Sequence, residues 1–294
     1  RNSYLETIIG RGVQMKVFVT GGAGYIGSHC AVELLNAGFD ICIYDNFINS
    51  DESALHGIQN ITGKSFDFIH GDILDKCKLL EEMQRFSPDI VLHFAALKSV
   101  SESVIRPLNY YHTNVTGTIN ILEVMQTVGC SSIVYSSSAT VYCSATMPPY
   151  NERSTINSSS PYGSTKEVSE RLIRDWVISG TKKNRAVCLR YFNPVGSHKS
   201  GCIGEAISGT PGNLMPVILQ VALKMRSHLN IFGNNYDTRD GTGARDYIHV
   251  VDLADGHLKA IQNLDRLASY EVLNLGTGQS TTVLELINCF TEVT

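Results

Sequence analysis

Two residues near the middle of the chain, Tyr162 and Lys166, have types and a spacing suited to acid–base chemistry. Ser160 and Pro161 precede them as a typical N-cap and first residue of a helix, which would place both side chains on one face. A phenol has a pKa of about 10, and lowering it by about three units needs about 4 kcal/mol of differential stabilisation of the phenolate. A neighbouring ammonium group and a second positive charge can supply this in a low-dielectric cleft. Chance is the alternative, but of the 13 tyrosines only Tyr162 has a lysine four positions on.

A run of hydroxyl side chains ends a strand-like segment upstream of this pair. The segment reads Ser136-Ser137-Ser138-Ala139-Thr140. Consecutive hydroxyls are poor core residues at a strand end, but they are good hydrogen-bond donors toward a substrate hydroxyl. We therefore expect this strand end to face the same ligand as Tyr162.

A glycine-rich turn follows the first apolar run of the chain and precedes an apolar-periodic stretch. Gly21 allows a tight turn, Gly24 lets backbone approach a pyrophosphate, and Gly27 lets the helix lie close to the strand. The helix N-terminus offers N–H groups and a positive dipole end to phosphates. An ordinary turn is the alternative, but the flanking strand and helix patterns favour a dinucleotide site.

Asp45 ends the second strand-like run, 18 residues after Gly27. A carboxylate there accepts hydrogen bonds from the adenosine ribose and repels a 2′-phosphate. No arginine or lysine occurs from Asn46 to Ser50, which favours NAD over NADP. The alternative is a strand-end aspartate in a turn. Asp72, after the third run, is placed to meet the adenine, and a helix N-cap is its alternative role.

Short apolar runs alternate with helical patterns through the first two thirds of the chain. The runs are 16–20, 40–44, 66–70, 89–94, 132–136 and 186–191, and the helical stretches are 27–37, 73–86, 108–128 and 161–179. This alternation indicates a parallel sheet with helices on both sides. The predicted fold class is α/β, a Rossmann-type doubly wound parallel sheet with a smaller, interleaved C-terminal substrate lobe.

The second lobe is predicted from a change in composition after residue 192, where Gly, Pro, Asn and Ser become frequent. Residues 246–260 have the pattern of a strand followed by a helix, so we expect the chain to return to the sheet there. The expected division has a leader or tail at 1–14 and an NAD-binding domain at 15–192 with a return of about 246–262. The substrate lobe is expected at 193–245 and 263–294.

The composition excludes several functional classes. The 294 residues are 43% hydrophobic and 18% charged, with a net charge of −4. This balance gives no indication of nucleic-acid binding, and no apolar stretch is long enough to span a membrane. The eight cysteines have no metal-ligand spacing, so no metal site is predicted. Several lie in apolar runs, which predicts buried, reduced thiols and a cytoplasmic location.

In this order, the motifs resemble the extended short-chain dehydrogenase/reductase family, and within it the nucleotide-sugar 4-epimerases. The segments that carry the resemblance are 20–29, 44–46, 93–98, 135–142, 162–166, 190–196, 213–216 and 240–257. The resemblance covers residues 15–294, and segment 240–257 is the most specific to the epimerase branch.

The resemblance implies reversible C4 epimerisation of UDP-glucose and UDP-galactose through a 4-keto intermediate, with NAD retained and regenerated in each cycle. It implies that Tyr162 takes the proton of the 4-hydroxyl, that Ser138 hydrogen-bonds this oxygen, and that Lys166 holds the nicotinamide ribose. By analogy, a homodimer would form through helices 108–128 and 161–179.

The resemblance also implies two sets of binding residues. The cofactor set is Gly21, Gly24, Tyr25, Ile26, Gly27, Asp45, Asn46, Ser50, Asp72, Ile73, Phe94, Ala95, Ala96, Lys98, Asn114, Tyr162, Lys166, Tyr191 and Phe192. The substrate set is Ser138, Ala139, Thr140, Tyr162, Asn193, Asn213, Leu214, Asn230, Ile231, Phe232 and Arg245. A guanidinium such as that of Arg245 can bind a diphosphate bidentately. An ion pair with Asp246 or Asp252 is its alternative role.

The chain departs from the family pattern in three places. Cys143 stands where a glycine is usual, and its Cβ would strain a turn that needs a positive φ. The interval between Ser138 and Tyr162 is one residue short. The family pattern also continues past the position of Thr294, so we expect a substrate site that is open on one side.

Two other functions stay open at this point. One is a related NAD-dependent nucleotide-sugar decarboxylase or dehydratase, but the dehydratases carry an Asp-Glu pair where Ala139 and Thr140 stand here. The other is a catalytically weak NAD-binding fragment, which the presence of both Tyr162 and Lys166 disfavours.

Overall fold

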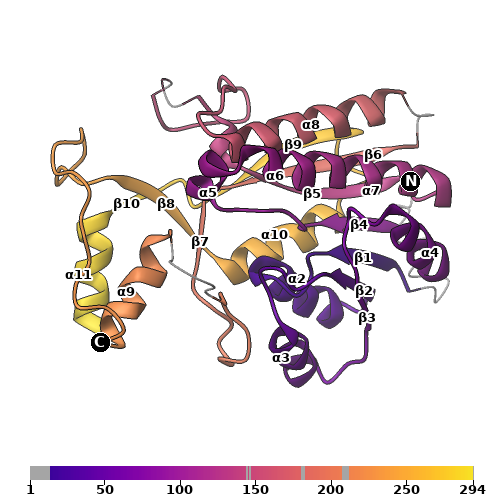
Figure 1. The fold of residues 1–294 in the computed structure, drawn as a ribbon, viewed down its shortest axis with the longest axis horizontal. Coiled ribbons are helices and arrows are strands. Elements are labelled where there is room, and N and C mark those ends of the chain that lie inside the picture. The colour runs from indigo at the N-terminus through magenta and orange to yellow at the C-terminus, as the bar shows by residue number, and fades with distance from the viewer. Residues whose placement is uncertain (1–13, 144, 146, 180–182, 207–211, 294) are drawn as a thin grey trace.

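The fold is built around a seven-stranded parallel sheet. The computed structural model describes residues 14–143, 145, 147–179, 183–206 and 212–293. In these residues the strand order of the large sheet is β3-β2-β1-β4-β5-β6-β9 (Figure 1). The strands are β1 (Lys16–Thr20), β2 (Asp40–Asp45), β3 (Asp67–His70), β4 (Ile90–His93), β5 (Ser132–Ser138), β6 (Arg185–Tyr191) and β9 (Tyr270–Leu275). All six predicted strands are present within two residues of their expected bounds.

The register brings the strand ends to one edge. Thr20 at the end of β1 lies beside Tyr44 of β2 and His93 of β4, and His93 lies beside Tyr135 of β5. The strand order reverses between β1 and β4, which is where open α/β sheets bind ligands. The loops after β1, β2, β4 and β5 therefore meet around one crevice.

Helices cover both faces of the sheet, as predicted. On one face lie α2 (Tyr25–Asn36), α3 (Glu52–Thr62) and α10 (Val250–Gln262), which bury Leu34, Ile58 and Leu253. On the other lie α4 (Lys76–Phe86), α7 (Gly117–Val128) and α8 (Pro161–Ser179). The strands contribute side chains to both of these cores, which explains their apolar runs.

Four helical segments differ from the expectation. The stretch 108–128 is divided into α6 (Pro107–Tyr110), the π-helical turn η1 (Tyr111–Thr116) and α7. Helix α4 begins at Lys76 rather than 73, because the Asp75 carboxylate accepts a hydrogen bond from the Lys78 N–H and caps the helix there. The helices α3 and α5 (Val100–Ile105) had no counterpart in the expected elements.

A small lobe lies beside the carboxyl edge of the large sheet (Figure 1). Its three-stranded sheet has the order β10-β8-β7, formed by β7 (Asn193–Val195), β8 (Ala244–His249) and β10 (Ser280–Thr282). Two helices, α9 (Leu214–Ala222) and α11 (Val283–Val293), complete the lobe.

The return of the chain to the large sheet differs from the expected one. Strand β8 joins the small sheet, and it is α10 that packs back against the large one. Residues 263–294 do not all lie in the small lobe, because β9 pairs with β6. Tyr270 and Val272 of β9 pack on one core of the sheet, and Leu273 and Leu275 on the other. The domain division itself stays a prediction.

Two cysteine expectations need correction. The φ angle of Cys143 is not positive, so its Cβ causes no strain at the position where the family has glycine. All eight thiols are free, but Cys77, Cys202 and Cys289 are exposed, so burial holds for only part of the set. The expected leader 1–14 lies outside the described residues except for Gln14. In the described part of the chain, no helix combines the length and hydropathy needed to cross a bilayer.

Candidate active site

A cavity of about 360 Å³ lies at the carboxyl edge of the large sheet. It is lined by every residue of the predicted cofactor set except Asn114. It is also lined by Ser138, Thr140, Asn193 and Asn213 of the predicted substrate set. The structure therefore brings the glycine-rich turn, the serine-rich strand end and the Tyr162–Lys166 pair to one place. Their binding roles stay predictions.

Gly21 in the turn after β1 and Gly27 in the first turn of α2 have no room for a side chain. Gly21 has a φ of +70°, and a Cβ there would lie 2.6 Å from the backbone nitrogen of Ala95. A Cβ on Gly27 would lie 2.3 Å from the carbonyl oxygen of Gly21. Helix α2 begins after Gly24 without a side-chain cap, so its N-terminus is open to the cavity. These features fit a pyrophosphate group.

The two predicted adenosine contacts are held by turn hydrogen bonds. Asp45 accepts from the N–H groups of Ala23 (3.0 Å) and Phe47 (2.9 Å). Asp72 accepts from the Asn46 amide at 3.0 Å and from the Leu74 N–H at 2.8 Å. Asp72 is not the helix N-cap that we considered as an alternative, since Asp75 takes that role. The carboxylates and the glycine turn fit NAD.

Tyr162, Lys166 and Ser138 lie together at the inner end of the cavity. The Lys166 ammonium donates to the carbonyl oxygen of Ser136 at 2.7 Å and lies 5.9 Å from the centre of the Tyr162 ring. The Ser138 oxygen accepts from the Thr140 hydroxyl at 2.9 Å, while Ser138 hydrogen-bonds Tyr162. The predicted N-cap is present, because the Ser160 oxygen accepts from the Gly163 N–H at 3.2 Å.

Burial moves the two pKa values of this pair in opposite directions. Loss of solvent raises the pKa of Tyr162 to about 12, partly offset by the hydrogen bond with Ser138. Loss of solvent also lowers the pKa of Lys166 to about 7, partly offset by the charge of Glu170. Each shift disfavours the charged form, as expected for buried groups. An added positive charge in the cavity would favour the phenolate of Tyr162.

A buried ion pair behind the active site has no counterpart in the sequence-based expectations. Glu170 and Arg190 form two hydrogen bonds, of 2.9 and 2.6 Å. Glu170 also accepts from the Ser137 hydroxyl at 2.5 Å, and Arg190 donates to the Tyr142 hydroxyl at 3.1 Å. The only sequence signal is that Glu170 follows Lys166 at helical spacing. The pair fixes the strand end that carries the serines.

Another unpredicted feature is that the segment after β7 reaches the cavity at Glu205. Glu205 lines the cavity and pairs with Lys98 at 3.1 Å. The Tyr25 hydroxyl donates to the carbonyl oxygen of Gly196 at 2.6 Å. The lining also includes Tyr44, Ile48, Asn49, Gly71, Leu97, Val100, Thr113, Ser136 and Pro194. Most of these directly neighbour a predicted residue, which is the signal that could have identified them.

Several predicted residues do not line the cavity. Asn114 is buried behind it, where its side chain donates to the Leu97 carbonyl (3.0 Å) and accepts from the Leu97 N–H (2.8 Å). Arg245 is exposed and donates to the carbonyl of Ala244, with no ion pair to Asp246 or Asp252 among the described residues. The remaining ones are Ala139, Leu214, Asn230, Ile231 and Phe232.

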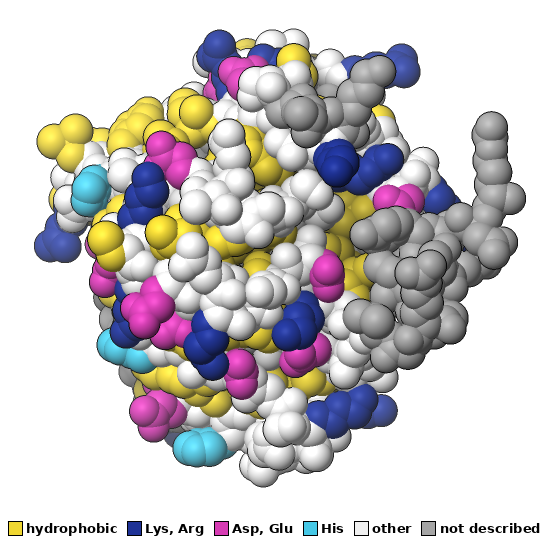
Figure 2. All heavy atoms as spheres, turned by 90° about the vertical axis from the view of Figure 1, so that its right-hand side faces the viewer, with side chains coloured by type: hydrophobic (Ala, Val, Ile, Leu, Met, Phe, Trp, Pro, Cys, Tyr) yellow, Lys and Arg dark blue, Asp and Glu magenta, His cyan; other side chains and the backbone are white. Residues whose placement is uncertain are grey.

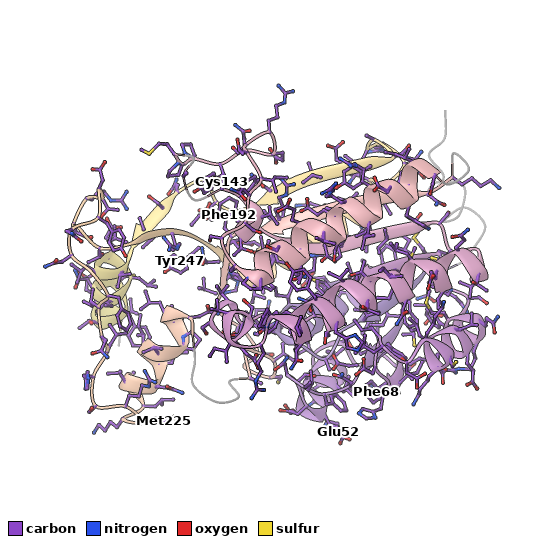
Figure 3. The ribbon with its side chains drawn as sticks, turned by 45° about the horizontal axis from the view of Figure 1, so that its top comes forward. Glu52, Phe68, Cys143, Phe192, Met225 and Tyr247 are labelled. Carbon is purple, nitrogen blue, oxygen red and sulfur yellow. The ribbon has the colours of Figure 1, made fainter. Side chains whose placement is uncertain are left out.

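The cavity lies where the large sheet meets the small lobe. Phe192, which lines the cavity, connects β6 to β7, and Figure 3 shows it near the junction with Tyr247 of β8 on the side of the lobe. Asn193 follows directly in the small sheet, and its side-chain amide donates to the Asp246 carbonyl at 2.9 Å. The site is thus assembled from both sheets.

Comparison with known proteins gives one consistent family. The model of the NAD dependent epimerase/dehydratase family matches residues 17–276. The chain is 49% identical over 279 residues to the UDP-glucose 4-epimerase of Bos taurus, covering 92% of this chain and 80% of the relative. It is 47% identical to that of Bacillus subtilis, covering 95% and 82%.

Solved structures agree with this comparison. The UDP-glucose 4-epimerase of Stenotrophomonas maltophila, with bound NAD and formylated UDP-arabinopyranose, is similar with a TM-score of 0.92 and 48% identity. The match covers 96% of this chain and 83% of that one. The enzyme of Bifidobacterium longum, in complex with NAD+ and UDP, is similar with a TM-score of 0.90 and 42% identity, covering 95% and 83%.

Proposed function

This chain belongs to the NAD dependent epimerase/dehydratase family, and from that we propose that it inverts C4 of UDP-glucose and UDP-galactose reversibly. The carrying observation is that Tyr162, Lys166 and Ser138 line the same cavity as the glycine-rich turn and Asp45. NAD, held by the glycine-rich turn and Asp45, would supply a reversible hydride acceptor for C4, and inversion requires that the 4-keto sugar be reduced on its opposite face.

The chain's own residues control the proton and the electrostatics. Tyr162 takes the proton from the 4-hydroxyl as this bond becomes a carbonyl, and gives it back when the sugar is reduced. Ser138 holds the same oxygen by a hydrogen bond. A protonated Lys166 stabilises the phenolate of Tyr162 and thereby lowers its pKa toward the working range. The buried Glu170 anion favours the protonated form of Lys166.

The pyrophosphate of the cofactor is assigned to the turn of Gly21, Gly24 and Gly27, and its ribose hydroxyls to Asp45. On the substrate side, Asn193 and Asn213 are assigned to the UDP portion because both line the cavity at the small lobe. Leu214, Asn230, Ile231, Phe232 and Arg245 are proposed to contact the same UDP portion, on the resemblance alone.

A dehydratase or decarboxylase is the second candidate. The strand end of this chain offers Ala139 and Thr140, and the Thr140 hydroxyl donates to Ser138 at 2.9 Å. Neither side chain is an acid that could protonate a leaving hydroxyl. The epimerase reaction needs no such acid, so the residues present favour it.

The direct test is conversion of UDP-galactose to UDP-glucose by the purified chain without added cofactor. We expect both conversion and NAD in the nucleotide released on denaturation. Tyr162→Phe should keep the NAD but lose at least about a hundredfold in kcat, since general-base catalysis contributes about that much or more.

Three outcomes would contradict the proposal in different ways. Bound NAD without conversion would leave a nucleotide-binding protein without epimerase activity. Formation of a 4-keto-6-deoxy sugar from UDP-galactose, or decarboxylation of UDP-glucuronate in a parallel assay, would favour the sibling enzymes. Absence of NAD together with absence of conversion would overturn the assignment of the cavity.

We further propose a homodimer formed by the helices of residues 108–128 and 161–179, together with α5, which packs on α8. Ile105 and Leu108 on α5 and α6 are 78% and 79% exposed, and Val104 beside them is 64% exposed. Adjacent exposed apolar side chains often mark interaction sites.

The face in Figure 2 shows acidic and basic side chains interspersed, which supports small-molecule and protein partners over nucleic acid. The free thiols support a cytoplasmic location.

A further inference from the structure

His257 is a buried polar residue for which the proposed reaction has no role. It closes the segment 240–257, the most family-specific part of the sequence. The structure places it on α10, the helix that returns from the small lobe to pack on the large sheet, and only 1% of it is exposed. A buried imidazole needs hydrogen-bond partners, and one of the two partners of His257, Tyr191, lines the cavity.

The hydrogen bonds of His257 have a fixed direction. Its Nδ1 lies 2.8 Å from the Leu253 carbonyl, which can only accept, so Nδ1 carries the proton. Burial lowers the pKa of His257 to about 4, so the ring is neutral at physiological pH. Nε2 is then an acceptor, and its partner is the hydroxyl of Tyr191. The Tyr191 hydroxyl therefore donates its hydrogen bond to Nε2 of His257.

The ring of His257 also supports two aromatic residues of the cavity. Its centroid lies 5.0 Å from that of Phe94 and 5.2 Å from that of Tyr191. Phe94 follows β4 and Tyr191 ends β6, and both line the cavity, whereas His257 itself does not. One buried imidazole thus stands behind two strand ends that are not neighbours in the sheet.

Building on the proposed function, we propose that His257 is a positioning residue of the cofactor site. It holds the side chains of Tyr191 and Phe94 in place, and through them the wall against which the cofactor lies. The residue connects α10 to the retention of NAD without touching it. Its loss should therefore loosen the cofactor more than it loosens the fold.

The test compares NAD release from purified holoenzyme variants. His257→Phe keeps a ring and removes the acceptor, while His257→Gln places a polar atom close to Nε2. Tyr191→Phe removes the hydroxyl from the other side, and Ile261→Val weakens the packing of the same helix as a control. NAD retained after dilution and dialysis is measured along with kcat, KM and the free energy of unfolding in urea.

We expect NAD release about tenfold faster from His257→Phe and Tyr191→Phe, the effect of losing one hydrogen bond. His257→Gln should remain close to wild type, and Ile261→Val should retain NAD although its stability falls. Combining His257→Phe with Tyr191→Phe should add little.

The inference is overturned if both Phe variants retain NAD as wild type does, or if Ile261→Val loses NAD equally. It is also overturned if His257→Gln releases NAD as fast as His257→Phe. Should His257→Phe not fold, Tyr191→Phe and His257→Gln decide alone. Failure of the proposed function has different signatures, namely wild-type protein that contains no NAD or wild-type protein that binds NAD without epimerase activity.

Discussion

Tyr162 and Lys166 show at the scale of single residues why the catalytic pair needs its ligand. Burial gives Lys166 a pKa of about 7 and Tyr162 a pKa of about 12, so neither group is held in its fully charged form near neutral pH. The Lys166 ammonium and the Tyr162 phenolate become favourable when both are present, because opposite charges stabilise each other in a medium of low dielectric. The reactive phenolate is thus a property of the loaded site.

Lys166 should give the cofactor-free protein a distinct pH dependence of stability. Its pKa is about 7 in the folded state, against 10.5 for the exposed group. Between these values the unfolded chain binds the extra proton, so stability rises with pH. The free energy of unfolding of wild type, relative to Lys166→Met, should rise by up to about 1 kcal/mol per unit from pH 7 to 10. The free energy of unfolding is measured by urea denaturation at each pH. The same pH dependence for wild type and Lys166→Met would contradict this prediction.

The proposed catalytic residues could be located from the sequence because their spacing is local, whereas the residues that support them are remote. Tyr162 and Lys166 are one helical turn apart, and that distance is visible in any sequence. Arg190 lies on β6 and meets Glu170 of α8 only through the packing of helix on sheet. His257 lies 66 positions from its partner Tyr191. Neither helical nor strand periodicity in the sequence indicates that such distant residues form pairs.

At the scale of elements, the junction of the glycine-rich turn with the first turn of α2 carries a severe steric constraint. Gly27→Ala would place a Cβ 2.3 Å from the Gly21 carbonyl oxygen, where only backbone movement can relieve the clash. We expect a loss of about 1–3 kcal/mol in stability and a loss of bound NAD. NAD content and thermal unfolding with and without NAD measure both effects.

Gly243→Ala is the matched control for this substitution, because nothing lies within 4 Å of its added Cβ and its φ is not positive. It should leave NAD content and stability close to wild type. Equal loss of NAD from the two variants would show that the turn is not specific to the cofactor.

Elements with a regular pattern were predictable, and those determined by tertiary packing were not. The six strands of the first lobe are apolar runs, and they form as expected. The stretch 108–128 has a continuous helical pattern, yet its middle widens to a π-helix in which Asn114 is turned toward the backbone of Leu97. Strand β9 mixes Glu271 and Asn274 with apolar residues, and this composition does not reveal a place in the large sheet.

At the scale of the whole molecule, the proposed dimer depends on the exposed apolar residues of α5 and α6. Ile105→Glu combined with Leu108→Glu should convert the protein to a monomer, because four buried carboxylates in one interface would lack partners. Met225, exposed in the small lobe (Figure 3), provides the control Met225→Glu. Light scattering at several concentrations measures the mass. A monomeric wild type, or a double variant that remains dimeric, would contradict the proposal.

The two sheets of the molecule are joined by short connections. Only Phe192 separates β6 from β7, and only residues 276–279 separate β9 from β10. Thr277 and Gly278 in the second link are tied to the Asp246 carboxylate by N–H donors at 2.9 and 2.8 Å. The second of these links is thus fastened to β8 of the small sheet. If both faces of a sugar are to meet one reaction centre between these two sheets, the ligand itself has to turn.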